Sequence, residues 1–233
     1  SNQGFTDFLG GAPANVACAL RKLKIDSIFI GRLGSDDFGK KFITQFNELE
    51  VNLDFLQLDN DLSTRVVNVD RDQFGDRFFS GFEPSSYSCF ADEALSKKLI
   101  EKELPNLEKI FQETKYLVTG TNLLSSPKSA ETIFFLIELA NKFEVKIIID
   151  LNWREVFWDY SSFSSDIKKK NRINLVKNFL NNAHFLKLAK EEATFFFEHE
   201  NPLLISQQMS KRPDVIITDG KNPVAWYING LQG

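Results

Sequence analysis

The sequence predicts an α/β fold with a mostly parallel central sheet, helices on both faces and a small β-hairpin standing off the sheet. From residue 92 onward, short apolar runs alternate with helical stretches, which is the pattern of parallel strands joined by helices. Residues 64–82 interrupt the α/β pattern with two β-rich runs on either side of Gln73–Asp76. This spacing predicts a hairpin with a loop longer than two residues.

The first third of the chain predicts two helices around one strand. Apolar residues at helical spacing, Val16, Ala19, Leu20 and Leu23, predict the first helix. Ser27–Ile30 predicts a buried strand, and Gly31–Gly39 a glycine-rich turn. The second amphipathic helix carries Phe42, Ile43, Phe46 and Leu49.

The second half of the chain predicts four strands of a parallel sheet. The apolar runs are Tyr116–Val118, Val145–Ile149, His184–Lys187 and Val215–Thr218. Helical stretches centre on residues 127–143, 167–181 and 190–211, the last broken near Asn201 and Pro202. Ligands of such sheets bind beyond the carboxyl ends of the strands, so polar residues there are the first candidates for a site.

Composition excludes several classes of protein. Lys and Arg number 28 against 32 Asp and Glu, a net charge of −4, which argues against a duplex nucleic-acid binder. No run approaches the roughly 18 apolar residues of a membrane span. Cys18 and Cys89 lack the spacing of a metal site or a disulfide framework, so we expect a reducing, cytoplasmic setting.

Three segments carry candidate binding residues, each with a simpler structural alternative. Gly10 and Gly11 allow close approach of a ligand while Asn15 offers a donor and an acceptor; the same residues also suit a tight turn and helix cap. Asp150–Arg154 follows a strand and ends in an Arg fork suited to phosphate, or forms a simple Asx turn. Thr218–Gly220 follows the last predicted strand and is equally typical of an ordinary turn.

Together these segments resemble the PfkB (ribokinase-like) family of carbohydrate kinases, and most closely its fructokinases. The similarity is carried by Phe8–Leu20, Gly31–Gly39, Asp150–Arg154 followed by Trp158, Lys187–Glu192 and Thr218–Gly220, in the family's order. It implies a ribokinase-like three-layer fold with a small β lid. The implied activity is ATP- and Mg²⁺-dependent phosphorylation of a sugar hydroxyl, with fructose as the favoured substrate.

The resemblance also implies roles for individual residues. Contacts to the sugar fall to Gly10, Gly11, Asn15, Arg65 and Arg154. Contacts to the nucleotide phosphates fall to Asn152, Lys187, Thr218 and Gly220. Asn152 and Glu192 match positions that organise Mg²⁺ through water. Two copies pairing through the lid are expected, as in many relatives.

The chain departs from the family pattern at several points. Ala189 stands where ribokinases have Asn, and Pro223 where a second glycine of the nucleotide turn is usual. No Gly-Ala-Gly-Asp segment, which would carry the catalytic base, occurs in the 233 residues, and the family's first strand would precede residue 8. We therefore expect residues 1–233 to form a single incomplete kinase domain with the lid at 64–82, inactive by itself.

Two alternatives stay open. One is another PfkB kinase, for 2-keto-3-deoxygluconate, ribose or a nucleoside. The other is a kinase-like binding or scaffold protein that has lost its base.

Overall fold

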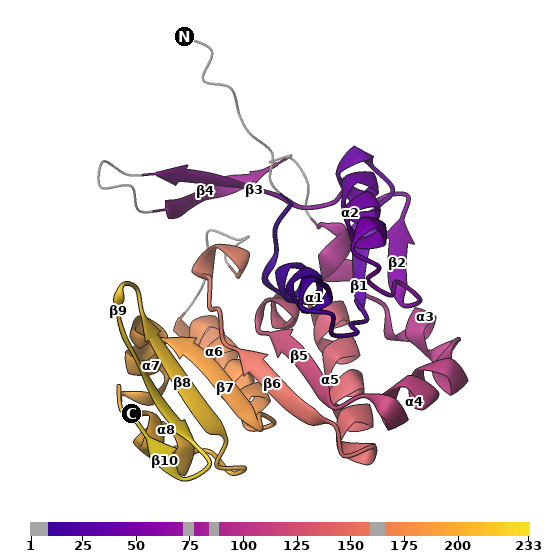
Figure 1. Cartoon of the computed structure of the whole chain (residues 1–233). Coiled ribbons are helices and arrows are strands. Elements are labelled where there is room, and N and C mark those ends of the chain that lie inside the picture. Colours follow the sequence, from indigo (N-terminus) through magenta and orange to yellow (C-terminus); the bar gives the residue numbers. More distant parts are fainter. Residues whose placement is uncertain (1–8, 72–76, 84–88, 159–165) are drawn as a thin grey trace. The chain divides into compact units, whose positions relative to one another are not determined.

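The computed structural model describes residues 9–71, 77–83, 89–158 and 166–233, and the chain divides into two compact units, residues 1–95 and 96–233. The elements of the first unit are, in order, α1 (Ala12–Lys22), β1 (Gly31–Gly34), α2 (Asp37–Glu48), β2 (Leu56–Asp59), β3 (Val66–Arg71), β4 (Arg77–Glu83) and the 3-10 helix η1 (Ala91–Ala94). Figure 1 shows them in indigo to magenta.

The first unit packs α1 and α2 around a small apolar core. Its buried members are Ala14, Ala17, Cys18, Phe46 and Val51. The predicted first helix is present as α1, but residues other than those at the predicting spacing form its buried side, because Val16 and Leu23 are exposed. Apolar residues occur around much of this helix, so periodicity could not identify the face that meets the aromatic rings of Phe29 and Phe46.

The strand expected at Ser27–Ile30 lies four residues later, at β1. Ile28 forms only an isolated parallel bridge with Asn52, and the ladder starts where Gly31 pairs with Leu56 of β2. A turn closed by the N–H of Leu56 on the carbonyl of Leu53 separates the bridge from the ladder. Part of the expected glycine-rich turn is therefore strand.

The predicted hairpin is present as an antiparallel sheet of β3 and β4. Val66 pairs with Glu83 and Arg71 with Arg77, with a register shift after Asn68. Within the described residues these strands pair only with each other. The expected loop at Gln73–Asp76 lies outside the described residues.

The second unit alternates helices and strands. Its elements are α3 (Lys97–Glu101), α4 (Leu104–Glu113), β5 (Tyr116–Gly120), η2 (Asn122–Ser125), α5 (Pro127–Lys142), β6 (Lys146–Asp150), η3 (Glu155–Phe157), α6 (Asp166–Leu180), β7 (Phe185–Ala189), α7 (Lys190–Phe197), α8 (Pro202–Gln208), β8 (Asp214–Asp219), β9 (Asn222–Ile228) and β10 (Leu231–Gln232). The four predicted strands and the break between α7 and α8 are confirmed.

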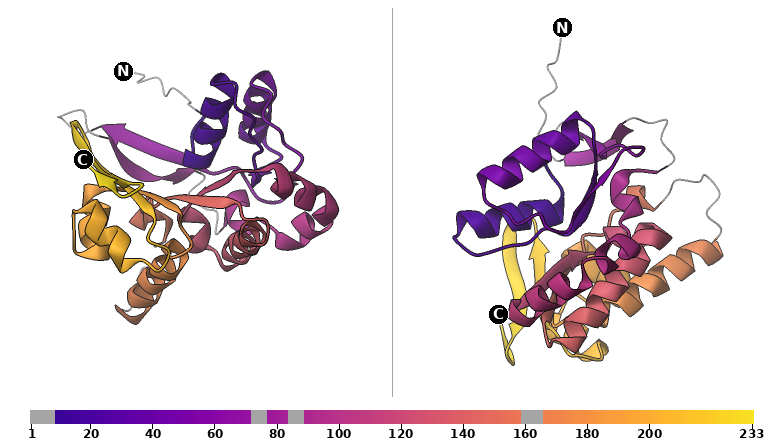
Figure 2. Two further views of the ribbon diagram at one scale, coloured as in Figure 1. Left: turned by 60° about the horizontal axis from the view of Figure 1, so that its bottom comes forward. Right: turned by 90° about the vertical axis from the view of Figure 1, so that its right-hand side faces the viewer.

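The sheet of the second unit has the order β10-β9-β8-β7-β6-β5. Strands β5 to β8 are parallel, and the antiparallel strands β9 and β10, which the sequence analysis missed, extend the sheet beyond β8. Because consecutive parallel strands are neighbours, right-handed crossovers place their connecting helices on one face; Figure 2 shows α5 to α8 on one side of this sheet.

Burial along the central strands follows from this one-sided cover. Ile147 and Ile149 of β6 are fully buried, whereas Ile148 between them is only partly buried. Leu186 and Leu188 of β7 repeat the pattern. Successive side chains of a strand point to opposite faces, so this pattern of burial marks the face that α5 to α8 cover.

Candidate functional site

The parallel strands of the second unit end together in a row of polar residues. The register pairs Gly120 with Asp150, and Asp150 with Lys187. Ala189 pairs with Thr218 one strand further on. The segments chosen from the sequence in this half of the chain therefore share one edge of one sheet.

Lys187 and Asp150 form an ion pair at this edge. The Nζ of Lys187 lies 3.0 Å from Oδ1 and 3.1 Å from Oδ2 of Asp150. Both side chains are partly exposed, at 42% and 31%. The ammonium group has three donors, so one that faces an acidic neighbour can still meet an incoming phosphate.

Glu192 joins the end of β6 to the start of α7. Its Oε1 accepts the N–H of Trp153 at 2.6 Å, and its Oε2 accepts the N–H of Ala189 at 2.7 Å. Burial raises the pKa of Glu192, while the two N–H donors and the nearby Arg154 act in the opposite direction. Asn152, just before Trp153, has a left-handed backbone with φ of 41°, a conformation that Asn tolerates better than most residues.

Arg154 leaves the same loop with its guanidinium partly exposed. Nη1 donates to the carbonyl of Trp153 at 3.0 Å and lies 4.0 Å from Oε1 of Glu192. The side chain is 41% exposed. Its planar fork is thus held at the strand edge while part of it faces solvent, as a phosphate-binding Arg requires.

An aromatic cluster fixes the ring of Trp153 beside Arg154. The ring centroid lies 4.8 Å from that of Trp158 and 5.4 Å from that of Phe196, and it stacks on Phe195 at 6.5 Å. Aromatic pairs at these separations contribute beyond their buried area. The loop that presents Arg154 is therefore anchored by both its backbone and its neighbouring side chain.

Thr218 and Gly220 lie at the end of β8. The Oγ1 of Thr218 donates a long hydrogen bond of 3.4 Å to the carbonyl of Leu188. Gly220 has a left-handed φ of 52°, and no atom lies within 4 Å of where a Cβ would stand. The backbone is thus open to close approach at this turn.

Sequence reasoning missed three residues at this edge. Lys190 lies 3.3 Å from Asp219 and 3.4 Å from Glu200, and the Asp219 carboxylate is the main reason that the pKa of Lys190 is raised. Asp150 was quoted within its motif but given no role. Thr121, fully buried, donates to the carbonyl of Leu151 at 2.6 Å and ties the ends of β5 and β6; its position just after an apolar strand was the available signal.

The remaining candidates belong to the first unit. Gly11 is the N-cap of α1 with φ of 104°, and its carbonyl accepts the N–H of Asn15 at 2.9 Å. Gly10, Gly11 and Asn15 are exposed, and nothing lies within 4 Å of a Cβ built on either glycine. The N-cap residue Gly11 makes no side-chain cap bond at this helix start.

Arg65, expected to contact sugar, is enclosed by two carboxylates. Its Nε lies 3.0 Å from Oδ2 of Asp92, its Nη2 lies 3.1 Å from Oε1 of Glu93, and its side chain is 7% exposed. The Arg65 guanidinium is therefore buried and paired with two carboxylates, whereas the Arg154 guanidinium is partly exposed to solvent.

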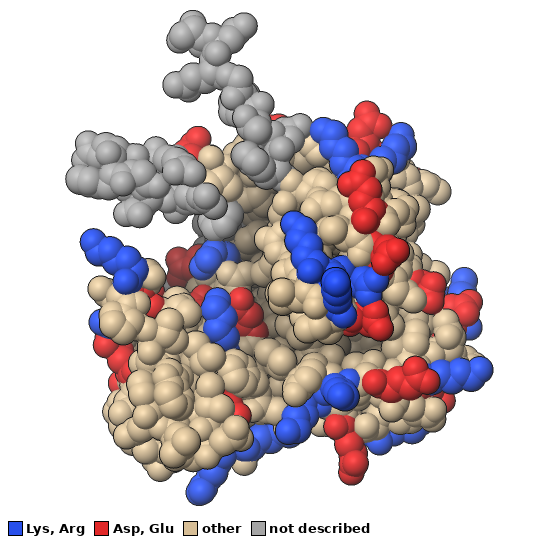
Figure 3. Space-filling view, in the orientation of Figure 1, with Lys and Arg blue, Asp and Glu red and all other residues tan. Residues whose placement is uncertain are grey.

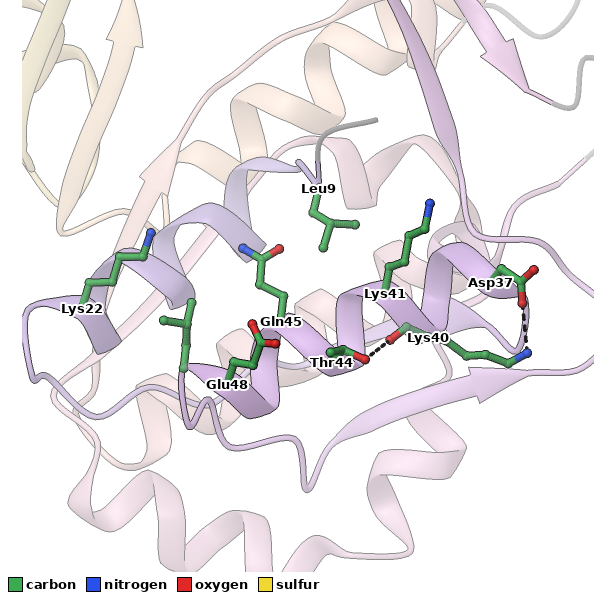
Figure 4. A pocket seen from close by; sticks show the side chains of 9 residues that line it. Leu9, Lys22, Asp37, Lys40, Lys41, Thr44, Gln45 and Glu48 are labelled. Atoms are coloured by element: carbon green, nitrogen blue, oxygen red, sulfur yellow. Dashed lines mark hydrogen bonds and ion pairs between the residues drawn. The ribbon is translucent and has the colours of Figure 1, made fainter. Parts of the chain in front are cut away.

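A pocket of about 810 Å³ opens between α1 and α2, and Figure 4 shows its lining. It is bounded by Leu9, Lys22, Asp37, Lys40, Lys41, Thr44, Gln45, Glu48 and Leu49. None of the expected sugar-binding residues lines it. On the face of the molecule shown in Figure 3, Lys and Arg side chains lie among Asp and Glu side chains.

Among the described residues, no group of three or more His, Cys, Asp or Glu side chains is arranged to hold a metal ion. Mg²⁺ commonly keeps several waters and binds one or two carboxylates together with substrate phosphates. Asp150, Asn152 and Glu192 supply oxygen donors suited to an ion carried in by a nucleotide.

A mostly parallel sheet covered by helices defines an α/β protein, and proteins of this class bind ligands beyond the carboxyl edge of the sheet. The chain belongs to the pfkB family of carbohydrate kinases, whose pattern it matches over residues 1–232. This confirms the family and the fold expected from the sequence.

Individual relatives agree with this assignment. The chain is 28% identical to Probable fructokinase-5 of Arabidopsis thaliana, over 99% of this chain and 66% of that protein. It is 30% identical to the 5-dehydro-2-deoxygluconokinase of Bacillus licheniformis, over 66% and 45% of the two. The crystal structure of Xylella fastidiosa fructokinase with bound ATP superimposes with a TM-score of 0.77 at 25% identity, covering 96% of this chain and 66% of that one. The chain thus spans about two thirds or less of these relatives.

In the part of the chain that the structure describes, no helix is both long and apolar enough to cross a membrane.

Proposed function

We propose that this chain carries the sugar-binding part and the phosphate-facing strand edge of an ATP-dependent sugar kinase, with fructose as the favoured acceptor. The observation that carries the proposal is the half-exposed fork of Arg154, anchored at the carboxyl edge of the sheet in a member of a carbohydrate kinase family. Similarity to a fructokinase that binds ATP supports the choice of nucleotide.

Arg65 apart, each candidate residue has a defined task in this proposal. The exposed backbone at Gly10 and Gly11 and the amide of Asn15 bind sugar hydroxyls. Arg154 directs its fork at the transferred phosphate. Lys187, with Thr218 and Gly220 at the neighbouring turn, binds the nucleotide phosphates. Phosphoryl transfer depends mostly on such positioning and on charge stabilisation.

Mg²⁺ is proposed to enter with the nucleotide and to neutralise charge on its phosphates. Asn152 and Glu192 orient the water molecules around it. Because both Glu192 oxygens accept backbone N–H groups, the carboxylate is held in a fixed orientation, which suits an indirect role better than direct coordination.

A coupled ADP-release assay with fructose, ATP and Mg²⁺ tests the proposal on two proteins: this 233-residue chain and the complete protein encoded by its gene. A positioned base contributes roughly 10²–10⁴-fold, and no Gly-Ala-Gly-Asp segment occurs here. We expect turnover only from the complete protein, provided that it carries such a segment. Comparable turnover by both would mean that the base lies within residues 1–233.

Similarity to a 5-dehydro-2-deoxygluconokinase favours a second candidate substrate class, the keto-deoxy sugar acids. A panel containing fructose, ribose, 2-keto-3-deoxygluconate, 5-dehydro-2-deoxygluconate and a nucleoside distinguishes them by kcat/KM. Inactivity of the complete protein on the whole panel, despite an intact base segment, favours the scaffold alternative.

Two further proposals concern setting and assembly. Cys18 and Cys89 are both free thiols, which supports a reducing, cytoplasmic setting. The β3–β4 hairpin pairs with no other described strand and exposes Val69, which supports a lid that pairs with a second copy. Sedimentation showing only monomer at micromolar concentration counts against the dimer.

A further inference from the structure

The root of the β3–β4 hairpin is held by a dense set of polar contacts. Thr64 is 4% exposed; its N–H donates to Oδ2 of Asp36 at 2.7 Å, and its Oγ1 accepts the N–H of Gly34 at 2.9 Å. The other oxygen of Asp36 accepts the N–H of Gly39 and caps α2. Thr64, two residues before β3, is thus bonded both to β1 and to the residue that caps α2.

Arg65, the next residue and the last before β3, contacts β4 and the segment around η1. Its guanidinium carbon lies 5.0 Å from the ring centroid of Phe82 on β4 and 4.7 Å from that of Phe90, just before η1. The two rings are 6.0 Å apart. Asp92 and Glu93 of η1 meet the edge of the guanidinium.

This arrangement is reinforced from the η1 side. The second carboxylate oxygen of Glu93 accepts the N–H of Phe90 at 2.8 Å. The N–H of Ala91 donates to the carbonyl of Ser63 at 3.0 Å. Because β3 and β4 pair with no other described strand, these root contacts tie the hairpin to β1, α2 and η1.

We propose that Arg65 is a positioning residue that fixes the hairpin against η1, rather than a sugar contact. The rings of Phe82 and Phe90 lie 5.0 and 4.7 Å from its guanidinium carbon, two carboxylates meet its edge and its side chain is 7% exposed, so little of it is left to face a substrate. This inference rests on the proposed function. In a sugar kinase, Arg65 would govern how tightly the sugar is enclosed, whereas other residues would set the rate of phosphoryl transfer.

The first test is hydrogen exchange on the complete, ligand-free protein, comparing wild type with Arg65→Lys. Lys keeps the charge but loses the planar fork and its stacking. We expect amides of Val66–Arg71, Arg77–Glu83 and η1 to exchange roughly tenfold faster or more, because a charge-assisted hydrogen bond is lost. Amides of β5 to β8 should keep the wild-type rate. Unchanged exchange in the hairpin overturns the proposal.

The second test is kinetic. Arg65→Lys should raise the KM for sugar severalfold or more while kcat stays within about threefold, since only enclosure is weakened. A fall in kcat with unchanged KM and unchanged exchange means that Arg65 touches the reacting groups, and overturns the proposal. The exchange result stands even if no sugar is turned over, so failure of the proposed function is distinguishable.

Matched variants complete the design. Lys41→Met removes another cation–π contact of the same unit, with Phe38 at 5.0 Å on α2, and should leave hairpin exchange unchanged. Glu93→Gln and Asp92→Asn each weaken one edge contact and should accelerate exchange in the same segments. If Arg65→Lys fails to fold, Glu93→Gln and Asp92→Asn provide the test. Hairpin amides that exchange at the wild-type rate in both variants overturn the proposal.

Discussion

The carboxylate of Glu192 accepts the backbone N–H of Trp153 at 2.6 Å, so a side chain on α7 holds the loop that leaves β6. The same carboxylate accepts the N–H of Ala189 with its other oxygen. One buried acid therefore connects two neighbouring strand ends, and the geometry of the candidate phosphate edge depends on it.

Glu192→Ala should lower the free energy of unfolding by about 1–3 kcal/mol, because two partly buried N–H groups lose their acceptor. Glu191 is exposed in the same helical turn, so Glu191→Ala serves as the matched control and should change stability by less than about 0.5 kcal/mol. Urea unfolding followed by circular dichroism measures both. Equal values for the two variants would contradict a connecting role for Glu192.

Arg154→Ala in the complete protein should reduce kcat/KM at least about tenfold, since a charge-assisted contact to phosphate is removed. Stability should change little because the side chain is 41% exposed. Arg154→Lys should recover only part of the loss, since Lys cannot form a two-pronged contact. Kinetic constants indistinguishable from wild type for Arg154→Ala would remove this residue from the site.

The environment of His184 should make the protein less stable to unfolding in mild acid. Its Nδ1 accepts the N–H of Ile147 at 3.0 Å, and burial, with help from Lys211 and Lys146, lowers its pKa below 6.5. The folded state thus favours neutral imidazole. The stabilisation is complete above pH 6.5 and is lost as the pH falls through the lowered folded-state pKa, because the unfolded chain takes up the proton first.

Urea midpoints of wild type and His184→Gln between pH 7.5 and 5.5 check this, since Gln does not titrate. The difference between the two proteins should shift against the wild type as the pH falls. A difference that stays constant over this range would show that His184 keeps its ordinary affinity for protons.

Asp59→Asn should destabilise the first unit by about 3 kcal/mol, because it leaves the guanidinium of Arg32 buried without a counter-charge. Arg32 and Asp59 are 14% and 7% exposed, and Oδ1 of Asp59 also accepts the N–H groups of Asp61 and Leu62. Asp37→Asn, which breaks the exposed pair with Lys40, should cost less than about 1 kcal/mol. Thermal unfolding of both variants gives the comparison.

The parallel strands could be predicted because each is a short apolar run bounded by turn residues. Val145–Ile149 and His184–Lys187 were located to within two residues of β6 and β7. The strand at β1 was misplaced because its position depends on where β2 begins, and β2 has no apolar run to reveal it. Strand β9 begins Asn222-Pro223, residues more typical of turns, so local sequence could not predict it.

In the candidate site, the positions of residues could be predicted from the sequence, but their contact partners could not. Strand-end position was enough to select Asn152, Arg154 and Thr218, since the sheet brings those ends to one edge. Partners were not predictable, because they come from residues far along the chain. Nothing near Arg65 in sequence indicates that Asp92 and Glu93, on η1, enclose it.

The order of strands in the second unit has a consequence for how fast it can fold. The contacts at the carboxyl edge join residues 30, 37 and 30 positions apart: Thr121 to Leu151, Asp150 to Lys187, and Leu188 to Thr218. Each contact requires a long loop to close, at a cost in chain entropy, before strand pairing contributes favourable free energy. Chains with such contacts fold in about milliseconds to seconds rather than microseconds. During that interval the apolar strands are exposed, so we expect refolding yield to fall as protein concentration rises.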